Sequence, residues 1–240
     1  SVYSASKLGA EEFPEYDVSL RSAVSIGRRI QDPLAELVKI DTKSIGVGQY
    51  QHDMNQKRLG EALGGVVEDC VNSVGVDLNT ASPALLSYVA GINAAVAKNI
   101  LKYREEHGKF TARRELLKVA KLGPKAYEQC AGFLRLPESE MPLDRTGVHP
   151  ESYAAAEGLL ALCGYGLADV AAKRVGGLAK KIKSPEKTAA ELGIGVPTLV
   201  DIMRELEKPG RDPREDAPAP VLRSDVLSIE DLQEGMVLTG

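Results

Sequence analysis

Two short turns hold the residues of this sequence whose types and spacing could bind an anion. The candidate residues are Ala90, Gly91, Ile92, Asn93 and Lys98 at the first turn, and Lys121, Leu122, Gly123 and Lys125 at the second. A tight turn that leads into a helix leaves backbone N–H groups without partners at the positive end of the helix dipole. Phosphate binds readily there, and a lysine in the following turns can hold a neighbouring phosphate. The two turns therefore predict contacts to phosphate groups.

Backbone freedom and local charge support this interpretation. Gly91 and Gly123 let a phosphate approach the main chain closely, and Asn93 is expected to adopt the left-handed conformation that a glycine would otherwise take. Residues 76–136 carry ten lysine and arginine residues against five acidic residues, a net +5 in a chain of net charge −4. An ordinary helical core with solvated charges is an equally open interpretation, because short glycine turns between helices are common.

Four helices are expected to position these turns. Ser82 and Pro83 open the first, because serine is a good N-cap and proline is tolerated at the first helical position. Each of the next three helices is expected to face the core with one set of apolar residues. The second helix presents Val96, Ala97, Ile100 and Leu101, and the third presents Leu116, Leu117 and Val119. The fourth starts at Pro124 and presents Tyr127, Cys130, Ala131 and Leu134. Asn93 and Gly123 occupy equivalent places thirty residues apart. Each repeat is too small to bury its own apolar face, so the two should pack as one domain.

The turns share the pattern of a hydrophobic residue, any residue, glycine, a hydrophobic residue, and glycine or asparagine. This pattern resembles the helix-hairpin-helix motif of DNA-binding proteins. Residues 77–82 and 103–110, with the first turn between them, resemble the tandem domain of ComEA-type DNA receptors. More of the chain is similar to the Tex family of bacterial transcription accessory proteins. Asn93 replaces the usual second glycine and Lys121 replaces the usual first glycine, so the first turn is expected to matter more than the second.

The Tex resemblance implies an order of segments along the chain. They are the end of a YqgF-like domain of RNase H fold (1–53), a connecting helix (54–75), a tandem helix-hairpin-helix domain (76–136), a helix-turn-helix region (143–208), a linker (209–227) and the first strand of an OB-fold RNA-binding domain (228–240). Most of the YqgF-like domain would lie upstream of Ser1, and the start at serine favours a fragment or a processed chain.

The predicted fold class is all-α, with a tandem helix-hairpin-helix domain inside a multi-helix array and a short β segment at the C-terminal end. Glycine and proline separate segments with a period near that of a helix. Helices are expected over 18–40 with a restart at Asp32, and over 59–74, 151–163, 167–182 and 185–192, with a last one from about residue 197. Residues 45–52 are expected to form a glycine-bearing loop or a short strand.

Two further glycine turns fit the hairpin pattern better than the first two. They contain Gly164 and Gly166, and Gly193 and Gly195, with an interval of 29 residues. Helix corners that need glycine are the preferred interpretation, and the resemblance implies a plain helix-turn-helix segment here. Residues 143–215 carry eleven basic and eleven acidic residues, which makes this half a weaker nucleic-acid candidate.

No catalytic, metal or cofactor site is expected. Asp32 is better explained as a helix-start residue before Pro33, and His52 and Asp53 as a solvated pair in a polar loop. His149 precedes a proline, with no serine, cysteine or paired carboxylate at a recognisable spacing. We therefore expect no enzyme activity in this chain.

Three scattered cysteines, at positions 70, 130 and 163, predict reduced thiols and a cytoplasmic protein, and no signal peptide or membrane-spanning run is recognised. The expected partners are nucleic acid, DNA or RNA, and the transcription machinery, with no membrane, and the expected state is a monomer.

Two functions remain open. One is non-sequence-specific phosphate-backbone binding in a transcription accessory factor. The other is a scaffold that docks transcription or translation proteins, with the hairpins serving structure only.

Overall fold

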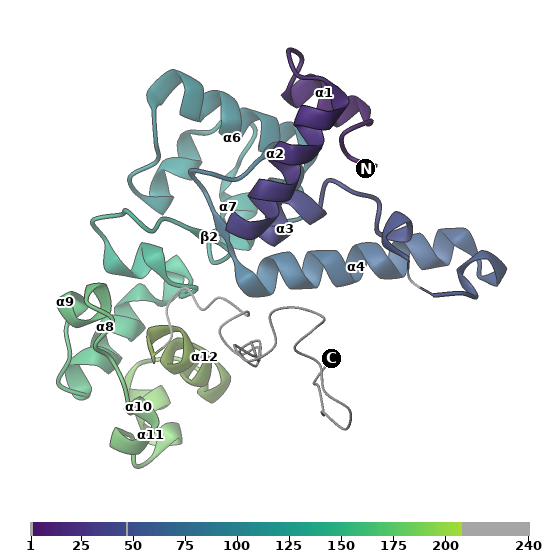
Figure 1. The fold of residues 1–240 in the computed structure, drawn as a ribbon. Coiled ribbons are helices and arrows are strands. Elements are labelled where there is room, and N and C mark those ends of the chain that lie inside the picture. The colour runs from purple at the N-terminus through teal and green to yellow at the C-terminus, as the bar shows by residue number, and fades with distance from the viewer. Residues whose placement is uncertain (1, 47, 208–240) are drawn as a thin grey trace, which may run out of the picture. The chain divides into compact units, whose positions relative to one another are not determined.

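The computed structural model describes residues 2–46 and 48–207, and the regular secondary structure of this part is helix except for two short strands (Figure 1). The all-α prediction is confirmed there. The predicted linker at 209–227 and the strand at 228–240 lie outside the described residues. None of the helices in the described part combines the length and the hydrophobicity that a bilayer crossing needs. Nor do the same residues gather three or more His, Cys, Asp or Glu side chains that could hold a metal ion.

Short polar side chains cap each of the first helices except the 3-10 helix η2 (Gln51–Asp53). The capped helices are α1 (Lys7–Glu12), α2 (Val18–Gln31), α3 (Pro33–Leu37), the 3-10 helix η1 (Thr42–Ile45) and α4 (Gln56–Val74). The Asp32 carboxylate accepts the N–H of Ala35 at 3.1 Å, and Pro33 takes the first helical position. The predicted restart and the helix-start role of Asp32 are therefore confirmed. In the described part of 45–52, short 3-10 turns stand where a strand was an alternative.

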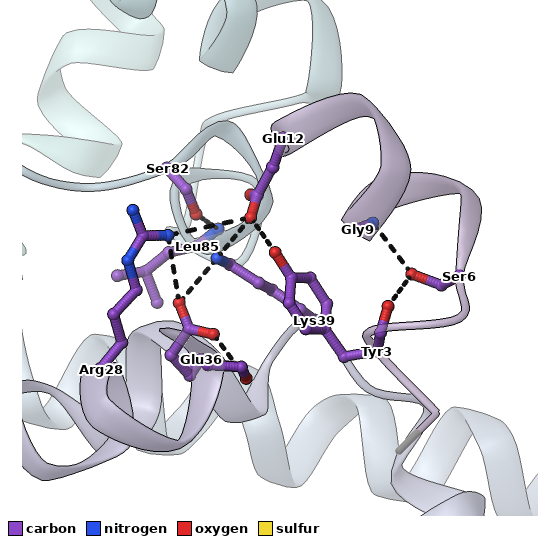
Figure 2. Close-up of polar contacts among 10 residues, drawn as sticks. Tyr3, Ser6, Gly9, Glu12, Arg28, Glu36, Lys39, Ser82 and Leu85 are labelled. Atoms are coloured by element: carbon purple, nitrogen blue, oxygen red, sulfur yellow. Dashed lines mark hydrogen bonds and ion pairs between the residues drawn. The ribbon is translucent and has the colours of Figure 1, made fainter. Parts of the chain in front are cut away.

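A cluster of charged side chains fastens α1, α2 and α3 together (Figure 2). The Lys39 ammonium lies 2.8 Å from a Glu36 carboxylate oxygen and 2.9 Å from one of Glu12. Arg28 lies 3.6 Å from Glu36, and the Tyr3 hydroxyl donates to Glu12. Burial raises the pKa of Tyr3, which keeps this donor protonated. Because each buried charge faces an opposite one, the cluster can hold these helices without an unpaired ion.

The first hairpin unit, residues 76–136, contains both repeats. Its elements are β1 (Val76–Asp77), α5 (Pro83–Leu86), α6 (Ala94–His107), the 3-10 helix η3 (Arg113–Lys118), α7 (Pro124–Cys130) and β2 (Leu134–Arg135). Buried side chains of both repeats form one core, which also includes Val38, just after α3, and Val71 of α4. The strands pair in parallel, with Val76 opposite Leu134, and so join the two ends of the unit.

Two parts of this unit differ from the prediction. Residues 113–118 form a 3-10 helix, in which Leu116 is buried whereas Leu117 is exposed. With three residues per turn, Leu116 and Val119 share the inner face and Leu117 points away. The last helix ends at Cys130, so the inward Leu134 belongs to β2 and not to a helix.

The second hairpin unit, residues 142–207, has its own core. It comprises the 3-10 helices η4 (Pro142–Arg145) and η5 (Pro150–Ser152), then α8 (Tyr153–Leu162), α9 (Leu167–Ala171), α10 (Leu178–Lys181), α11 (Pro185–Glu191) and α12 (Val196–Glu207). The single helix predicted over 167–182 is wrong, because Lys173 and Gly177 adopt left-handed backbone conformations and separate α9 from α10.

The two hairpin units are joined through buried polar contacts. The Arg113 side chain is 1% exposed, and its guanidinium donates to carbonyl groups of residues on both sides of the join, among them Leu134 at 2.6 Å and Val148 at 2.7 Å. His149 is a turn residue, as predicted. Its Nε2–H donates to the Glu128 carbonyl at 2.8 Å, and its Nδ1 accepts the N–H of Glu151.

Candidate nucleic-acid interface

The first hairpin turn, residues 90–93, uses its residues differently from the prediction. Gly91 holds the left-handed conformation, with φ of 81°, and Ile92 is buried. Asn93 has an extended backbone, with φ of −90°, so its predicted left-handed conformation is wrong. Its side chain caps α6 instead, accepting the N–H groups of Ala95 and Val96 at 3.0 and 2.9 Å. Two backbone donors of the α6 start are therefore already occupied.

The second hairpin turn, residues 120–123, repeats this geometry with a different cap. Lys121 is left-handed, with φ of 66°, Leu122 is buried, and Gly123 is extended at the start of α7. Gly123 has no side chain to cap α7, and Pro124 has no N–H. Among the described residues, no acceptor faces the N–H groups of Lys125 and Ala126. The second turn therefore leaves these two donors free, whereas the corresponding donors at the first turn are capped.

The two glycines differ in the space around them. A Cβ atom added at Gly91 would lie 2.7 Å from the Gln129 Cβ and 3.1 Å from the Ala126 carbonyl oxygen. A Cβ added at Gly123 would meet no atom within 4 Å. Gly91 thus permits close packing of the first turn on α7, and only Gly123 leaves the open approach that was predicted for both.

Reciprocal contacts hold the two turns together. Gly91 packs against Ala126 and Gln129 of α7, and the Asn99 amide of α6 donates to the Ala120 carbonyl of the second turn at 2.7 Å. Asn99 and Gln129 are thirty residues apart, the same interval as between the turns. Each turn is therefore fixed against the helix that follows the other turn, which gives the pair a defined geometry.

Only some of the ten cations in this unit are available to an external anion. Arg113 is buried, and Arg104 donates to the carbonyls of Leu78 and Ala81 at 3.0 and 2.9 Å. Arg135 lies 3.8 Å from Glu205. Burial lowers the pKa of Arg104 and of Arg135.

Three lysines of the unit face carboxylates: Lys102, Lys109 and Lys118. The hydrogen bond that Lys109 donates to the Glu138 carboxylate raises the pKa of Lys109. Of the ten cations of this unit, four are exposed and have no carboxylate oxygen of the described residues within 4.0 Å, namely Lys98, Arg114, Lys121 and Lys125. Three of them are predicted site residues. Arg114 was missed, because nothing in the sequence shows which of two adjacent arginines is buried.

Replacing Lys121 with glycine should stabilise the protein. A side chain in the left-handed region costs roughly 1–2 kcal/mol, and the greater freedom of glycine in the unfolded chain returns part of it, so we expect a gain of about 0.5–1 kcal/mol. Urea unfolding followed by circular dichroism measures the change. Lys125→Gly is the matched control and should lower stability, because Lys125 lies in helical backbone. A loss of stability in Lys121→Gly would contradict the assigned backbone strain.

The two later glycine turns have hairpin backbones as well. Gly164 and Gly193 are left-handed, with φ of 76° and 68°, and the next residue in each turn donates its N–H five residues back, Tyr165 to Leu160 and Ile194 to Ala189. This bond is typical of the Schellman motif that ends many helices. The turns of the second hairpin unit thus share the left-handed residue with those of the first but not this bond, since Ile92 and Leu122 donate only three residues back, to Val89 and Val119.

Comparison with protein families assigns three parts of the chain. Residues 71–135 match a helix-hairpin-helix motif, residues 141–214 match an HHH domain, and residues 1–31 match the Tex protein YqgF-like domain. The first match contains both turns of the first hairpin unit. The second contains the turns at Gly164 and Gly193, a region where the sequence resemblance implied a helix-turn-helix segment.

Curated relatives match the chain over its whole length. It is 57% identical to an uncharacterized protein, YdcI, of Bacillus subtilis, and 54% identical to the transcriptional accessory protein Tex of Neisseria gonorrhoeae. It is 40% identical, over 295 aligned positions, to the human S1 RNA-binding domain-containing protein 1. These alignments cover 100% of the chain and 33%, 31% and 29% of the relatives, so the chain spans about a third of their length.

Proposed function

Because the chain belongs to the Tex family over the third of those proteins that it spans, we propose that it is a nucleic-acid-binding part of a transcription accessory factor. In this proposal it grips the phosphate backbone without reading sequence, and it has no catalytic role. The observation that carries the proposal is the reciprocal packing of the two turns of the first hairpin unit, which presents exposed, unpaired cations beside free backbone N–H groups. We also propose that the protein is monomeric and cytoplasmic.

Both turns take part, with unequal roles. The second turn supplies the open approach at Gly123, the free N–H groups of Lys125 and Ala126, and the side chains of Lys121 and Lys125. The first turn supplies mainly Lys98, because its own asparagine caps α6. We therefore place more of the contacts at the second turn, which reverses the ranking expected from the sequence.

This mode of contact makes binding weak and insensitive to sequence. Backbone N–H groups and lysines reach phosphates, which carry no information about the bases. With roughly two to four phosphate contacts, we expect a dissociation constant in the micromolar range or weaker at physiological salt.

Fluorescence anisotropy with two unrelated oligonucleotides of equal length, each prepared as single- and double-stranded DNA and RNA, tests the proposal. We expect the two sequences to bind within about threefold of each other in every form, because the turns contact no base edge. A preference of a hundredfold or more, about 3 kcal/mol, would show base readout and contradict sequence-independent binding.

The packing of Gly91 favours a second candidate function. This glycine lies against α7, and Asn93 caps its own helix, so the first turn is fully explained by structure. A scaffold that docks transcription or translation proteins through its helices would need nothing more. Such a scaffold should show no affinity for any of the oligonucleotides at low salt, which separates it from the first proposal.

A further inference from the structure

We infer that residues 173–187, called the basic segment below, form an additional surface that contacts the phosphate backbone of nucleic acid. The inference rests on the proposed function and extends it to a second surface, outside all the hairpin turns.

The basic segment concentrates charge that the overall composition hides. Its one acidic residue is Glu186. All six of its cations are exposed, namely Lys173, Arg174, Lys180, Lys181, Lys183 and Lys187. The equal number of acidic and basic residues in 143–215 thus reflects separation along the chain, and it does not mean that the surface is neutral everywhere.

Most of these cations have no anion among the residues that the structure describes. Arg174 lies 3.4 Å from Asp169. Lys181 donates to the Cys163 carbonyl at 2.8 Å and lies 3.9 Å above the Tyr165 ring. For the other four, Lys173, Lys180, Lys183 and Lys187, no carboxylate oxygen of the described residues lies within 4.0 Å.

The fold fixes the basic segment in place, which distinguishes it from a mobile basic tail. Val175 and Leu178 are buried in the core of the second hairpin unit. The Tyr165 hydroxyl donates to the Gly176 carbonyl at 2.9 Å, and the Leu178 N–H donates to Glu207 at 2.7 Å. The six cations therefore belong to a folded segment of fifteen residues, and an external polyanion would screen their mutual repulsion.

The side chains fit a polyphosphate better than an acidic protein. Stable protein interfaces have a hydrophobic core with aromatic anchors, and the basic segment has no aromatic residue. Val175 and Leu178 are buried in the core and Ile182 packs against it half-buried, so the exposed side chains of the segment are mainly its six cations. Flexible lysines suit the regular, closely spaced charges of a nucleic-acid backbone, which need no shaped pocket.

The test compares two triple variants of the full chain that change the net charge equally. One is Lys180→Gln, Lys183→Gln, Lys187→Gln. The control is Lys7→Gln, Lys57→Gln, Arg58→Gln, at exposed positions of α1 and α4. Affinity for single- and double-stranded DNA and RNA of equal length is measured between about 50 and 200 mM salt, the range in which phosphate contacts are strongly salt-dependent. Circular dichroism and melting verify folding, and the single Lys→Gln variants replace any triple variant that does not fold.

We expect the basic-segment variant to bind at least about tenfold more weakly at the lower salt, with a slope of log K against log salt that is shallower by roughly two to three units on duplex DNA. The control should bind like the parent.

Lys173→Gly offers an independent readout. Because Lys173 has a left-handed backbone, with φ of 53°, this variant should melt at a higher temperature and still bind nucleic acid more weakly.

If the basic-segment variant binds like the parent while Lys98→Ala and Lys125→Ala bind more weakly, the inference is overturned and the proposed function stands. If the basic-segment variant loses affinity while the hairpin variants bind like the parent, the inference holds and the hairpin contacts are wrong. A parent that binds polyglutamate, used as an acidic-peptide probe, and none of the nucleic acids would overturn both.

Discussion

Replacing Arg113 with methionine should destabilise the protein by about 3–5 kcal/mol, the usual cost of removing one partner from a buried charge network. The guanidinium lies between the two hairpin units and donates to the carbonyls of Leu134 and Val148 and to the Tyr153 hydroxyl. Methionine would fill much of the volume but would leave these oxygens without a donor, at about 1–3 kcal/mol for each buried unsatisfied group. Asp144, which is also buried, accepts the Tyr153 hydroxyl, so it would lose the link to the guanidinium that runs through Tyr153.

Urea unfolding followed by circular dichroism measures this effect, and Arg114→Met is the matched control. Arg114 is the next residue, but it is exposed and has no carboxylate oxygen within 4.0 Å in the described chain. Its replacement should change stability by less than about 0.5 kcal/mol, as is usual for surface sites. Equal unfolding midpoints for the two variants would show that the Arg113 network does not join the units as described.

Gly91→Ala should destabilise the protein by about 2–4 kcal/mol, from left-handed strain together with overpacking. The added methyl group would lie 2.7 Å from the Gln129 Cβ, at a backbone φ of 81°. Gly123→Ala is the matched control, since it adds the same group in open space at a φ of −83°. It should cost no more than about 1 kcal/mol, through a poorer helix cap.

Thermal or urea unfolding of both variants distinguishes packing from phosphate access. If the two alanines cost the same, Gly91 is not closely packed against α7 and the reciprocal contact between the repeats is wrong. The comparison also decides which variant can report on binding. Weaker binding by Gly91→Ala would be explained by a disturbed turn, whereas weaker binding by a stable Gly123→Ala would point to the open approach at the second turn.

The features that could be predicted from the sequence are local. Serine or aspartate followed by proline marks the starts of α3 and α5, and Pro124 marks the start of α7, because caps and proline act within one helical turn. The repeat of thirty residues likewise placed both hairpin turns. The backbone at the equivalent positions Asn93 and Gly123 is extended in both cases, so the equivalence was correct although the conformation predicted for Asn93 was wrong.

The features that could not be predicted depend on distant residues or on strain. In the sequence Arg113 was one of ten cations in residues 76–136 with nothing to mark it as buried, because its partners lie more than twenty residues away along the chain. Leu134, expected at the end of a helix, lies in β2 because it pairs with Val76, far earlier in the chain. Lys121 and Lys173 gave no sign of a left-handed backbone, since lysine rarely adopts one. The left-handed backbone at Lys173 also interrupts the helix expected over 167–182.

The salt dependence of nucleic-acid affinity tests the central claim most directly. The parent is compared with the double variant Lys98→Ala, Lys125→Ala and with Lys57→Ala, Arg58→Ala as the matched control. If the hairpins grip phosphates, the slope of log K against log salt should become shallower by roughly 1.8 units on duplex DNA, or about 1.4 on single strands, with unchanged helicity and an unchanged control. If the folded hairpin variant keeps the slope and the affinity of the parent, the hairpins are structural and the phosphate-binding account is contradicted.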